Sequence, residues 1–268
     1  MPNFQVINKT AHATRRWLRN ANYSFTANER MAALVAAELP KAMMGMPIGF
    51  VAQGEGFVPV VLLSLIEERN LFVAQDGRWL GTYVPAAYRA HPFRLARTPE
   101  GKDVLCIDEG SIAPEGGADG QPFFDDDGEP AKTVLEVLDL LTKTEQNRVA
   151  TEAACALLQR HGLLQPWPVS VQTEAGARQI GGLFQVNEEA LNAVPAEALA
   201  ELRSGGALMI AYSQMLSMQH LQKLGALAEG HAKVAAQAKA AQERLAPARE
   251  LDLEFLNNGG TISFGNLG

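Results

Sequence analysis

Residues 70–96, with the sequence NLFVAQDGRWLGTYVPAAYRAHPFRLA, decide the fold that we expect for this chain. The dipeptide Asp76-Gly77 stands between two apolar runs. This is a strong hairpin signal, because glycine accepts the positive φ that such turns require. The stretch also holds two of the four tyrosines and one of the three tryptophans. We therefore expect a β-hairpin here, with the core assembled around its large side chains.

Apolar runs on both sides of this stretch predict further strands. They cover residues 47–51, 57–66 and 102–108, and a glycine-containing turn separates the first two. The run at 57–66 is almost wholly apolar, which is typical of a strand buried on both faces. We expect one mostly antiparallel sheet from residue 48 to residue 108.

Two capping boxes predict helices in the first 162 residues. A threonine followed three residues later by glutamate occurs at Thr26 and again at Thr133, and this spacing satisfies the free amides at a helix start. The first helix should end at Pro40, because proline cannot continue a helix interior. The second should end before Gly162 and span about 42 Å, enough to cross a domain.

The order of these elements predicts the fold class. Hairpins come early and helices late, without regular strand–helix alternation, which favours an α+β fold. We expect a mostly antiparallel sheet, a long crossing helix and a smaller helical C-terminal unit. The expected parts are an N-terminal α+β unit at 1–162 built on the 70–96 hairpin, a smaller α+β unit at 163–230 packed on it, and a helical arm with a short strand-like tail at 231–268.

Composition limits the function classes. The chain of 268 residues has a net charge of −7 and a pI near 5.3, so we expect no nucleic-acid partner, which would require clustered Lys and Arg. No apolar run reaches the roughly 18 residues that a transmembrane helix needs. The N-terminus lacks the charged-then-apolar pattern of a signal peptide. This predicts a cytoplasmic protein or, alternatively, a cell-surface protein exported by a signal-less route.

No motif for catalysis, metal binding or a cofactor stands out. Cys106 and Cys155 lie in an apolar run and in an Ala-rich run, and we interpret both as small buried hydrophobes. The acidic turn at 123–128 resembles a calcium loop, but Phe123 and Val134 occupy positions that need carboxylates. We therefore expect no metal site and no cofactor, and catalytic residues stay unassigned.

One group of side chains combines aromatic rings with polar tips, as ligand pockets do. It consists of Arg78, Trp79, Tyr83, Tyr88, His91 and Arg94. These residues are the candidate binding site for a peptide or a small molecule. The alternative is that the aromatic residues are cross-strand core pairs and that His91 is a partly buried capping histidine.

Several short motifs, in this order, resemble those of bacterial SapC-like proteins. They are VAAELP at 35–40, FVPV at 57–60, NLFV at 70–73, DGRW at 76–79, YVP at 83–85, PF at 92–93, CIDE at 106–109, the segment 124–130, GLFQVNE at 182–188 and LDL at 251–253. The resemblance runs from about residue 20 to the end of the chain. It is carried by the combined order of the motifs.

The resemblance implies a biological system in which the protein works, and it implies no particular reaction. The family name comes from a surface-layer system of Gram-negative bacteria, and members resemble companions of flavin-dependent halogenase-like, cupin-like and TonB-dependent receptor genes. Our first hypothesis is a non-enzymatic binding or assembly protein of such a surface-layer or accessory system. The alternative is an enzyme or enzyme accessory that acts on a peptide or small molecule, with a pocket near His91.

The C-terminal residues suggest self-association or a protein partner. Residues 232–246 have high helix propensity and little apolar surface, and residues 261–264 are β-prone and uncharged. We expect a homodimer in which residues after about 227 contribute to the contact. The alternative is a tail that packs on its own chain or nowhere.

Overall fold

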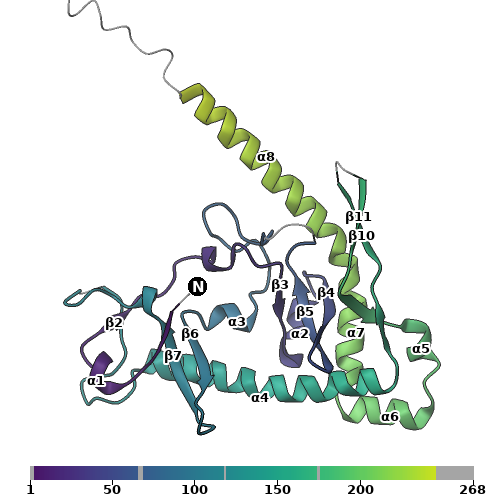
Figure 1. The fold of residues 1–268 in the computed structure, drawn as a ribbon, viewed down its shortest axis with the longest axis horizontal. Coiled ribbons are helices and arrows are strands. Elements are labelled where there is room, and N and C mark those ends of the chain that lie inside the picture. Colours follow the sequence, from purple (N-terminus) through teal and green to yellow (C-terminus); the bar gives the residue numbers. More distant parts are fainter. Residues whose placement is uncertain (1–2, 66–68, 118, 174–175, 246–268) are drawn as a thin grey trace, which may run out of the picture. The chain divides into compact units, whose positions relative to one another are not determined.

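A computed structural model of the chain describes residues 3–65, 69–117, 119–173 and 176–245 (Figure 1). Helices and strands both occur, and the strand pairs with assigned register are antiparallel. The expected α+β class, with a long helix and a helical C-terminal part, is confirmed.

A five-stranded sheet holds the main core. Its centre is the pair β4 (Ile48–Gln53) and β5 (Gly56–Leu62), joined through Gly54 at φ 58°. Both strands follow the apolar runs that the sequence predicts. The strand order is β3-β5-β4-β12-β9. The edge strands are β3 (Met31–Ala33) and β9 (Leu164–Pro166), and β12 (Leu183–Val186) lies between β4 and β9.

A separate three-stranded sheet has the order β1-β7-β6. Its strands are β1 (Phe4–Val6), β7 (Asp103–Asp108) and β6 (Phe93–Arg97). The single sheet expected from 48 to 108 is therefore wrong, because its strands divide between two sheets. A further pair, β2 (Arg16–Trp17) with β8 (Gln121–Pro122), places Trp17 directly opposite Gln121.

The region around Asp76-Gly77 forms a turn and one bridge instead of a two-stranded hairpin. The turn is as expected, with Gly77 at φ 82°, but Val73 and Trp79 make only an isolated antiparallel bridge. Side chains compete with the ladder here: Asp76 accepts from the Arg78 amide at 3.0 Å, and Asn70 accepts from the Phe72 amide at 3.0 Å. The expected turn is confirmed and the expected strands are wrong.

The helix expected between Thr26 and Pro40 is also wrong. Thr26 ends the 3₁₀ turn η1 (Ser24–Thr26) and its hydroxyl donates to the Tyr23 carbonyl, so it does not cap a helix. Residues 31–33 instead form β3, which pairs with β5. Local propensity does not indicate such a long-range contact. A second 3₁₀ turn, η2 (Ala36–Glu38), leads into α2 (Leu39–Ala42), where Pro40 lies in the first turn instead of ending the helix.

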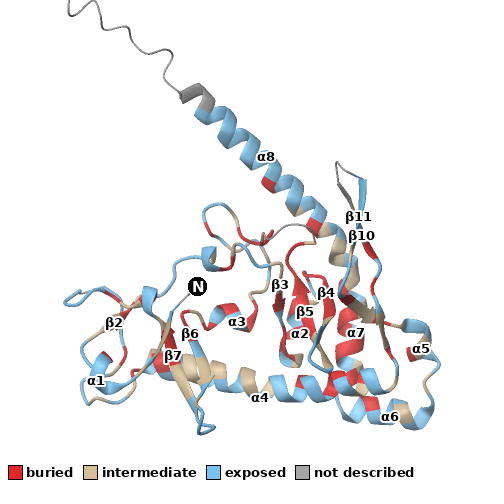
Figure 2. Cartoon of the chain, viewed as in Figure 1, coloured by how far each residue is buried: buried red, intermediate tan, exposed pale blue. Residues whose placement is uncertain are grey.

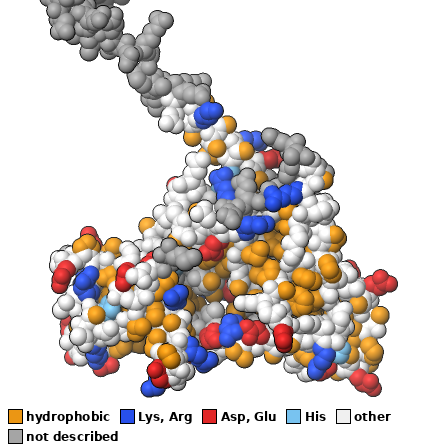
Figure 3. Space-filling view, in the orientation of Figure 1, with side chains coloured by type: hydrophobic (Ala, Val, Ile, Leu, Met, Phe, Trp, Pro, Cys, Tyr) orange, Lys and Arg blue, Asp and Glu red, His pale blue; other side chains and the backbone are white. Residues whose placement is uncertain are grey.

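Helix α4 (Lys132–Arg160) has 29 residues and packs against β5 of the first sheet and β6 of the second (Figure 1). It ends as expected, with Gly162 in the left-handed conformation at φ 65°. Its start differs, because Ala131 is the N-cap and no side chain caps the helix, so the Thr133 capping box is wrong. Along its exposed side, basic and acidic side chains alternate (Figure 3), as in the 2.6 Å pair of Arg148 with Glu145.

The C-terminal part of the first unit adds a hairpin and several helices. The hairpin is β10 (Val169–Thr173) with β11 (Gly176–Ile180). The helices are α5 (Glu188–Asn192), α6 (Ala196–Ser204) and α7 (Ala207–Ser217), followed by the 3₁₀ turn η4 (Met218–His220) and α8 (Leu221–Leu245). The 3₁₀ turn η4 thus separates α7 from α8.

The chain divides into two compact units, Met1–Ala228 and a second one beginning at Glu229. Helix α8 runs across this boundary, and the side chains from 232 to 242 are exposed, in agreement with the Ala-rich composition. The strand-prone residues 261–264, and the dimer contact expected there, lie outside the described residues.

The first unit contains two hydrophobic cores. The larger one is centred on β4, β5 and α7, where buried residues concentrate (Figure 2). The smaller one contains Trp17, Phe93 and Phe123 under the N-terminal half of α4. The short helix α3 (Ala86–Arg89) and the residues that follow it connect the two cores.

Candidate functional site

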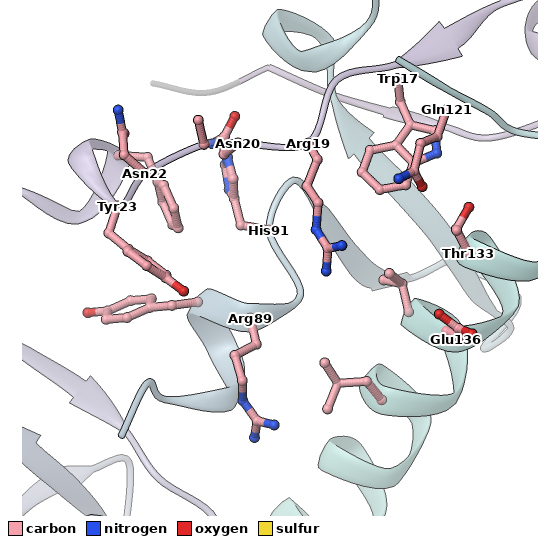
Figure 4. Close-up of a pocket in the computed structure, with 15 residues that line it drawn as sticks. Trp17, Arg19, Asn20, Asn22, Tyr23, Arg89, His91, Gln121, Thr133 and Glu136 are labelled. Atoms are coloured by element: carbon pink, nitrogen blue, oxygen red, sulfur yellow. The ribbon is translucent and has the colours of Figure 1, made fainter. Parts of the chain in front are cut away.

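A pocket of about 380 Å³ opens between the two cores of the first unit (Figure 4). Residues 17–25 and 88–91 form two of its walls. A third wall is one face of α4, where Thr133, Glu136, Val137 and Leu140 recur at helical spacing. Gln121 joins them from β8, because the β2–β8 pairing sets it beside Trp17.

The wall opposite α4 is aromatic. The rings of Phe25 and His91 stack in parallel with their centroids 3.7 Å apart, and Tyr88 lies edge-on to Phe25 at 6.1 Å. The Tyr88 hydroxyl donates to Glu29, and burial together with this carboxylate raises the pKa of Tyr88 well above its usual range. Tyr88 therefore stays neutral and fixed, as part of a rigid wall.

Polar atoms without partners gather at the α4 end of the pocket. In the part of the chain that the structure describes, six buried side-chain nitrogen or oxygen atoms lack a hydrogen-bond partner. Three of the six line this pocket, namely Trp17 Nε1, Gln121 Oε1 and Thr133 Oγ1. Buried polar atoms are bonded in the great majority of cases, and an unbonded one costs about 1–3 kcal/mol. All three atoms have almost no accessible surface, so they lie beneath the lining of the pocket and not on it.

Two charged side chains of the pocket are also unpaired. Arg19 extends into the space between His91 and α4, and Glu136 lies on α4 one turn after Thr133 (Figure 4). Neither forms a hydrogen bond or ion pair with another described residue. Arg89 also lines the pocket, but its guanidinium donates to Tyr83 Oη at 3.1 Å.

The buried carboxylate of Glu38 holds α3 in place. It accepts hydrogen bonds from the amide of Val35 at 3.1 Å, the hydroxyl of Tyr83 at 2.7 Å and the amide of Ala86 at 2.6 Å. Burial and this carboxylate raise the pKa of Tyr83 above its usual range. Because Ala86 is the first residue of α3, Glu38 fixes the helix that carries Tyr88 and His91 to the pocket.

The SapC family model matches residues 7–224 of the chain. This chain belongs to the SapC family. Comparison with curated proteins and with solved structures gave no match. The family resemblance drawn from the motifs is thereby confirmed.

The structure brings two of the six predicted site residues of this SapC-family chain into the pocket, Tyr88 and His91. Trp79 and Tyr83 pack behind it, with Trp79 Nε1 donating to the Tyr83 carbonyl at 2.7 Å. The other two lie elsewhere: Arg78 is exposed and pairs with Asp76, and Arg94 is exposed with its guanidinium over the Phe4 ring.

Sequence reasoning missed the polar end of the pocket in this SapC-family chain. Trp17, Gln121 and Thr133 come from three distant segments and share no motif. The one local signal was the threonine of the supposed capping box. Because Ala131 rather than Thr133 is the N-cap of α4, the Thr133 hydroxyl has no helix amide to accept from and stays buried without a partner.

The described residues contain no group of three or more His, Cys, Asp or Glu side chains that could hold a metal ion. None of the helices in the described ranges has the length and apolarity needed to cross a membrane. Burial raises the pKa of the Cys155 thiol to about 12 and also raises that of Cys106. Both thiols are therefore protonated near neutral pH, as expected for small buried hydrophobes.

His91→Asn is expected to make stability less dependent on pH. Burial lowers the pKa of His91, and the charge of Asp108 opposes this shift in part. The unfolded chain, with an imidazole pKa of about 6.5, then binds the proton more readily than the folded chain. The lowered pKa of His91 therefore reduces the free energy of unfolding of the wild type as the pH falls through about 6.5, the pKa in the unfolded chain. Well above that pH it has no effect on stability.

Denaturant unfolding of both proteins between about pH 8 and about pH 5 measures this difference. The variant should lose less free energy of unfolding than the wild type over the range. If the free energy of unfolding changes equally with pH in the two proteins, the lowered pKa of His91 is contradicted.

Proposed function

We propose that this SapC-family chain is a binding protein that holds a small polar ligand in the pocket beside His91. The observation that carries the proposal is a cavity that combines an aromatic wall with two charged side chains, Arg19 and Glu136, that have no partner among the described residues. A polar ligand would supply partners for these charges. The cavity volume of about 380 Å³ falls in the usual range for small-molecule sites.

The state of His91 favours binding over catalysis. A general base works best with a pKa near the operating pH and a ring held by a hydrogen bond. Burial lowers the pKa of His91, its ring stacks on Phe25, and its side chain forms no hydrogen bond with another described residue. The non-enzymatic role is therefore the first candidate, and an enzyme or enzyme accessory using the same pocket is the second.

The biological setting is part of the proposal and rests on the family alone. We propose a surface-layer system or an associated accessory system of a bacterium, with the pocket as the point at which a component of that system is recognised. Self-association through the C-terminal residues stays a separate proposal, to be tested by the mass of the chain in solution.

Equilibrium dialysis tests the binding role. The full chain is dialysed against the small-molecule fraction of a bacterial extract, and compounds retained on the protein side are identified by mass spectrometry. The matched control is the double variant Arg19→Gln, Glu136→Gln, which keeps polar side chains in both places and removes the two charges of the pocket.

The proposal predicts a compound that the wild type retains, that the double variant releases, and that is recovered unchanged. Conversion of that compound to a product would favour the enzyme alternative. Retention of nothing, or equal retention by both proteins, would refute binding in this pocket.

Thr133→Val is expected to stabilise the ligand-free chain by about 1 kcal/mol, because a methyl group replaces a buried hydroxyl that has no partner. The control is Thr151→Val on the same helix. The Thr151 hydroxyl donates to the Asn147 carbonyl at 2.6 Å and accepts from the Ala36 amide at 2.7 Å.

The control should lower the free energy of unfolding by about 1–3 kcal/mol, because the Ala36 amide is left unbonded. Denaturant titration of both variants gives the comparison. Equal destabilisation by the two substitutions would show that the Thr133 hydroxyl is already bonded in the free protein.

A further inference from the structure

We propose that a separate pocket, called the Val58 pocket below, binds a small uncharged apolar molecule about the size of toluene. It has a volume of about 230 Å³ and lies between the five-stranded sheet, α3 and α4. It shares no lining residue with the pocket beside His91. The inference therefore goes beyond the proposed function, because it adds another class of ligand at another place.

Three elements form the walls of the Val58 pocket. Ala33 comes from β3, Val58 comes from β5, and Ala87 comes from the exposed side of α3. Thr144 and Arg148 lie one turn apart on the face of α4 that borders the pocket. The surface that these elements leave accessible to a guest is mainly apolar.

The buried polar groups of these walls are bonded inside the protein. The Thr144 hydroxyl donates to the Leu140 carbonyl at 2.7 Å, and the Thr151 hydroxyl donates to the Asn147 carbonyl at 2.6 Å. The buried Glu38 carboxylate already accepts three hydrogen bonds. A guest with hydroxyl or amide groups would lose its bonds to water and find few replacements here, which favours an apolar guest.

The charges at the mouth of the pocket disfavour charged guests. Arg148 pairs with Glu145 at 2.6 Å and also with Glu152, and about half of each side chain is exposed. The two carboxylates leave one negative charge in excess, which repels an anion. An ammonium group would have to displace Arg148 from them. Gln53 is also exposed at the mouth and stays in contact with water.

The volume of the Val58 pocket limits the guest to about one ring. An apolar cavity of about 150 Å³ binds benzene, whereas drug-sized ligands occupy about 300–1,000 Å³. At about 230 Å³, this pocket fits a single ring with a short substituent or an aliphatic group of similar size. Removal of that apolar surface from water supplies the driving force for binding.

A peptide fits the Val58 pocket less well than a small molecule. An apolar side chain of a peptide would bring main-chain amides to the mouth, and these amides need partners when they leave water. Arg148 and its two carboxylates are bonded to one another. The Leu34 amide beside the pocket donates to the Pro59 carbonyl at 2.9 Å, so this main-chain pair is also occupied.

NMR titration of the full chain with toluene tests the proposal. The methyl signals of Val58 and Val35 report on the pocket, and Val149 is the reference, because it is exposed on α4 and lies outside the lining. We expect the Val58 and Val35 signals to shift saturably, with a dissociation constant of about 1 mM or lower, and the Val149 signals to stay unchanged. Benzoate has a carboxylate in place of the methyl group and should bind at least about tenfold more weakly.

Two substitutions that fill the pocket assign the site. Ala87→Phe places a ring in the space from α3, and Ala33→Leu fills it from β3; both alanines are exposed, so the fold should tolerate the changes. Each variant should bind toluene at least about tenfold more weakly than the wild type. The control is Ala150→Phe, which adds the same ring at an exposed position of α4 outside the pocket and should leave binding unchanged.

The proposal is overturned if toluene leaves the Val58 and Val35 signals unshifted, or if benzoate binds as tightly as toluene. It is also overturned if Ala87→Phe binds toluene as tightly as the wild type. If Ala87→Phe does not fold, Ala33→Leu decides in its place. Dialysis against the extract with the Arg19 and Glu136 double variant concerns the pocket beside His91, so either test can fail without the other.

Discussion

Glu38→Ala is expected to lower the free energy of unfolding by about 4 kcal/mol, one of the two largest effects that we predict for a single substitution. Glu38 is only 5% exposed, and its carboxylate accepts three hydrogen bonds, two from main-chain amides and one from Tyr83. Alanine would leave all three donors without an acceptor in a buried place, and each such loss costs about 1–3 kcal/mol. Denaturant titration at neutral pH measures the change.

Two controls show whether the effect comes from these bonds. Glu38→Gln keeps an acceptor oxygen and should cost less than alanine. Glu109→Ala removes an exposed glutamate that bonds to the Asn3 side chain and should change stability by less than about 0.5 kcal/mol. A loss of less than about 1 kcal/mol in Glu38→Ala would show that the three donors find other partners.

Trp79→Ala is expected to cost about 3–4 kcal/mol. Its indole lies 5.7 Å from the Phe72 ring, 5.5 Å from Tyr23 and 5.8 Å from Tyr88, and its N–H donates to the Tyr83 carbonyl. Half-burial keeps the expected cost below that of a fully enclosed tryptophan. Since Tyr23 and Tyr88 line the pocket, the variant should also bind ligand more weakly.

Thermal and denaturant unfolding test this prediction. Trp79→Phe is the matched variant, because it keeps an aromatic ring among its neighbours and loses the hydrogen bond, so its cost should be smaller. An alanine variant that melts within about 2 °C of the wild type would show that the turn region is peripheral to the core.

The elements that could be predicted from sequence are those with strong local signals. The strands β4 and β5 follow continuous apolar runs, and α4 follows a helical pattern that ends at Gly162 in the expected conformation. In each case, the residues that specify the element lie within it. The turn at Gly77 belongs to the same group.

The elements that could not be predicted depend on distant partners. Residues 31–33 form a strand because they pair with β5, although the preceding threonine matches a capping box. The second sheet likewise depends on a distant partner, because β1 pairs with β7, with Phe4 opposite Asp108. Neither contact leaves a pattern in the local sequence.

The candidate site divides in the same way. Tyr88 and His91 could be predicted because they stand close together in an aromatic stretch of the sequence. The unpaired atoms of Trp17 and Gln121 could not, because the β2–β8 pair joins segments about a hundred positions apart. The role of Thr133 depends on where α4 begins, and a difference of two residues changes its hydroxyl from a cap to a buried group without a partner.

The most direct test of the central claim follows the indole N–H of Trp17 by NMR. The chain has three tryptophans and so three indole N–H signals, which single substitutions assign. Trp79 is the internal reference, because its N–H is already bonded to the Tyr83 carbonyl.

We predict that the small-molecule fraction of a bacterial extract, added to the labelled chain, shifts the Trp17 signal, because the Trp17 ring lines the pocket. The Trp79 signal should shift less. If the Trp17 signal stays unchanged at saturating extract, the claim that this pocket binds a ligand is contradicted.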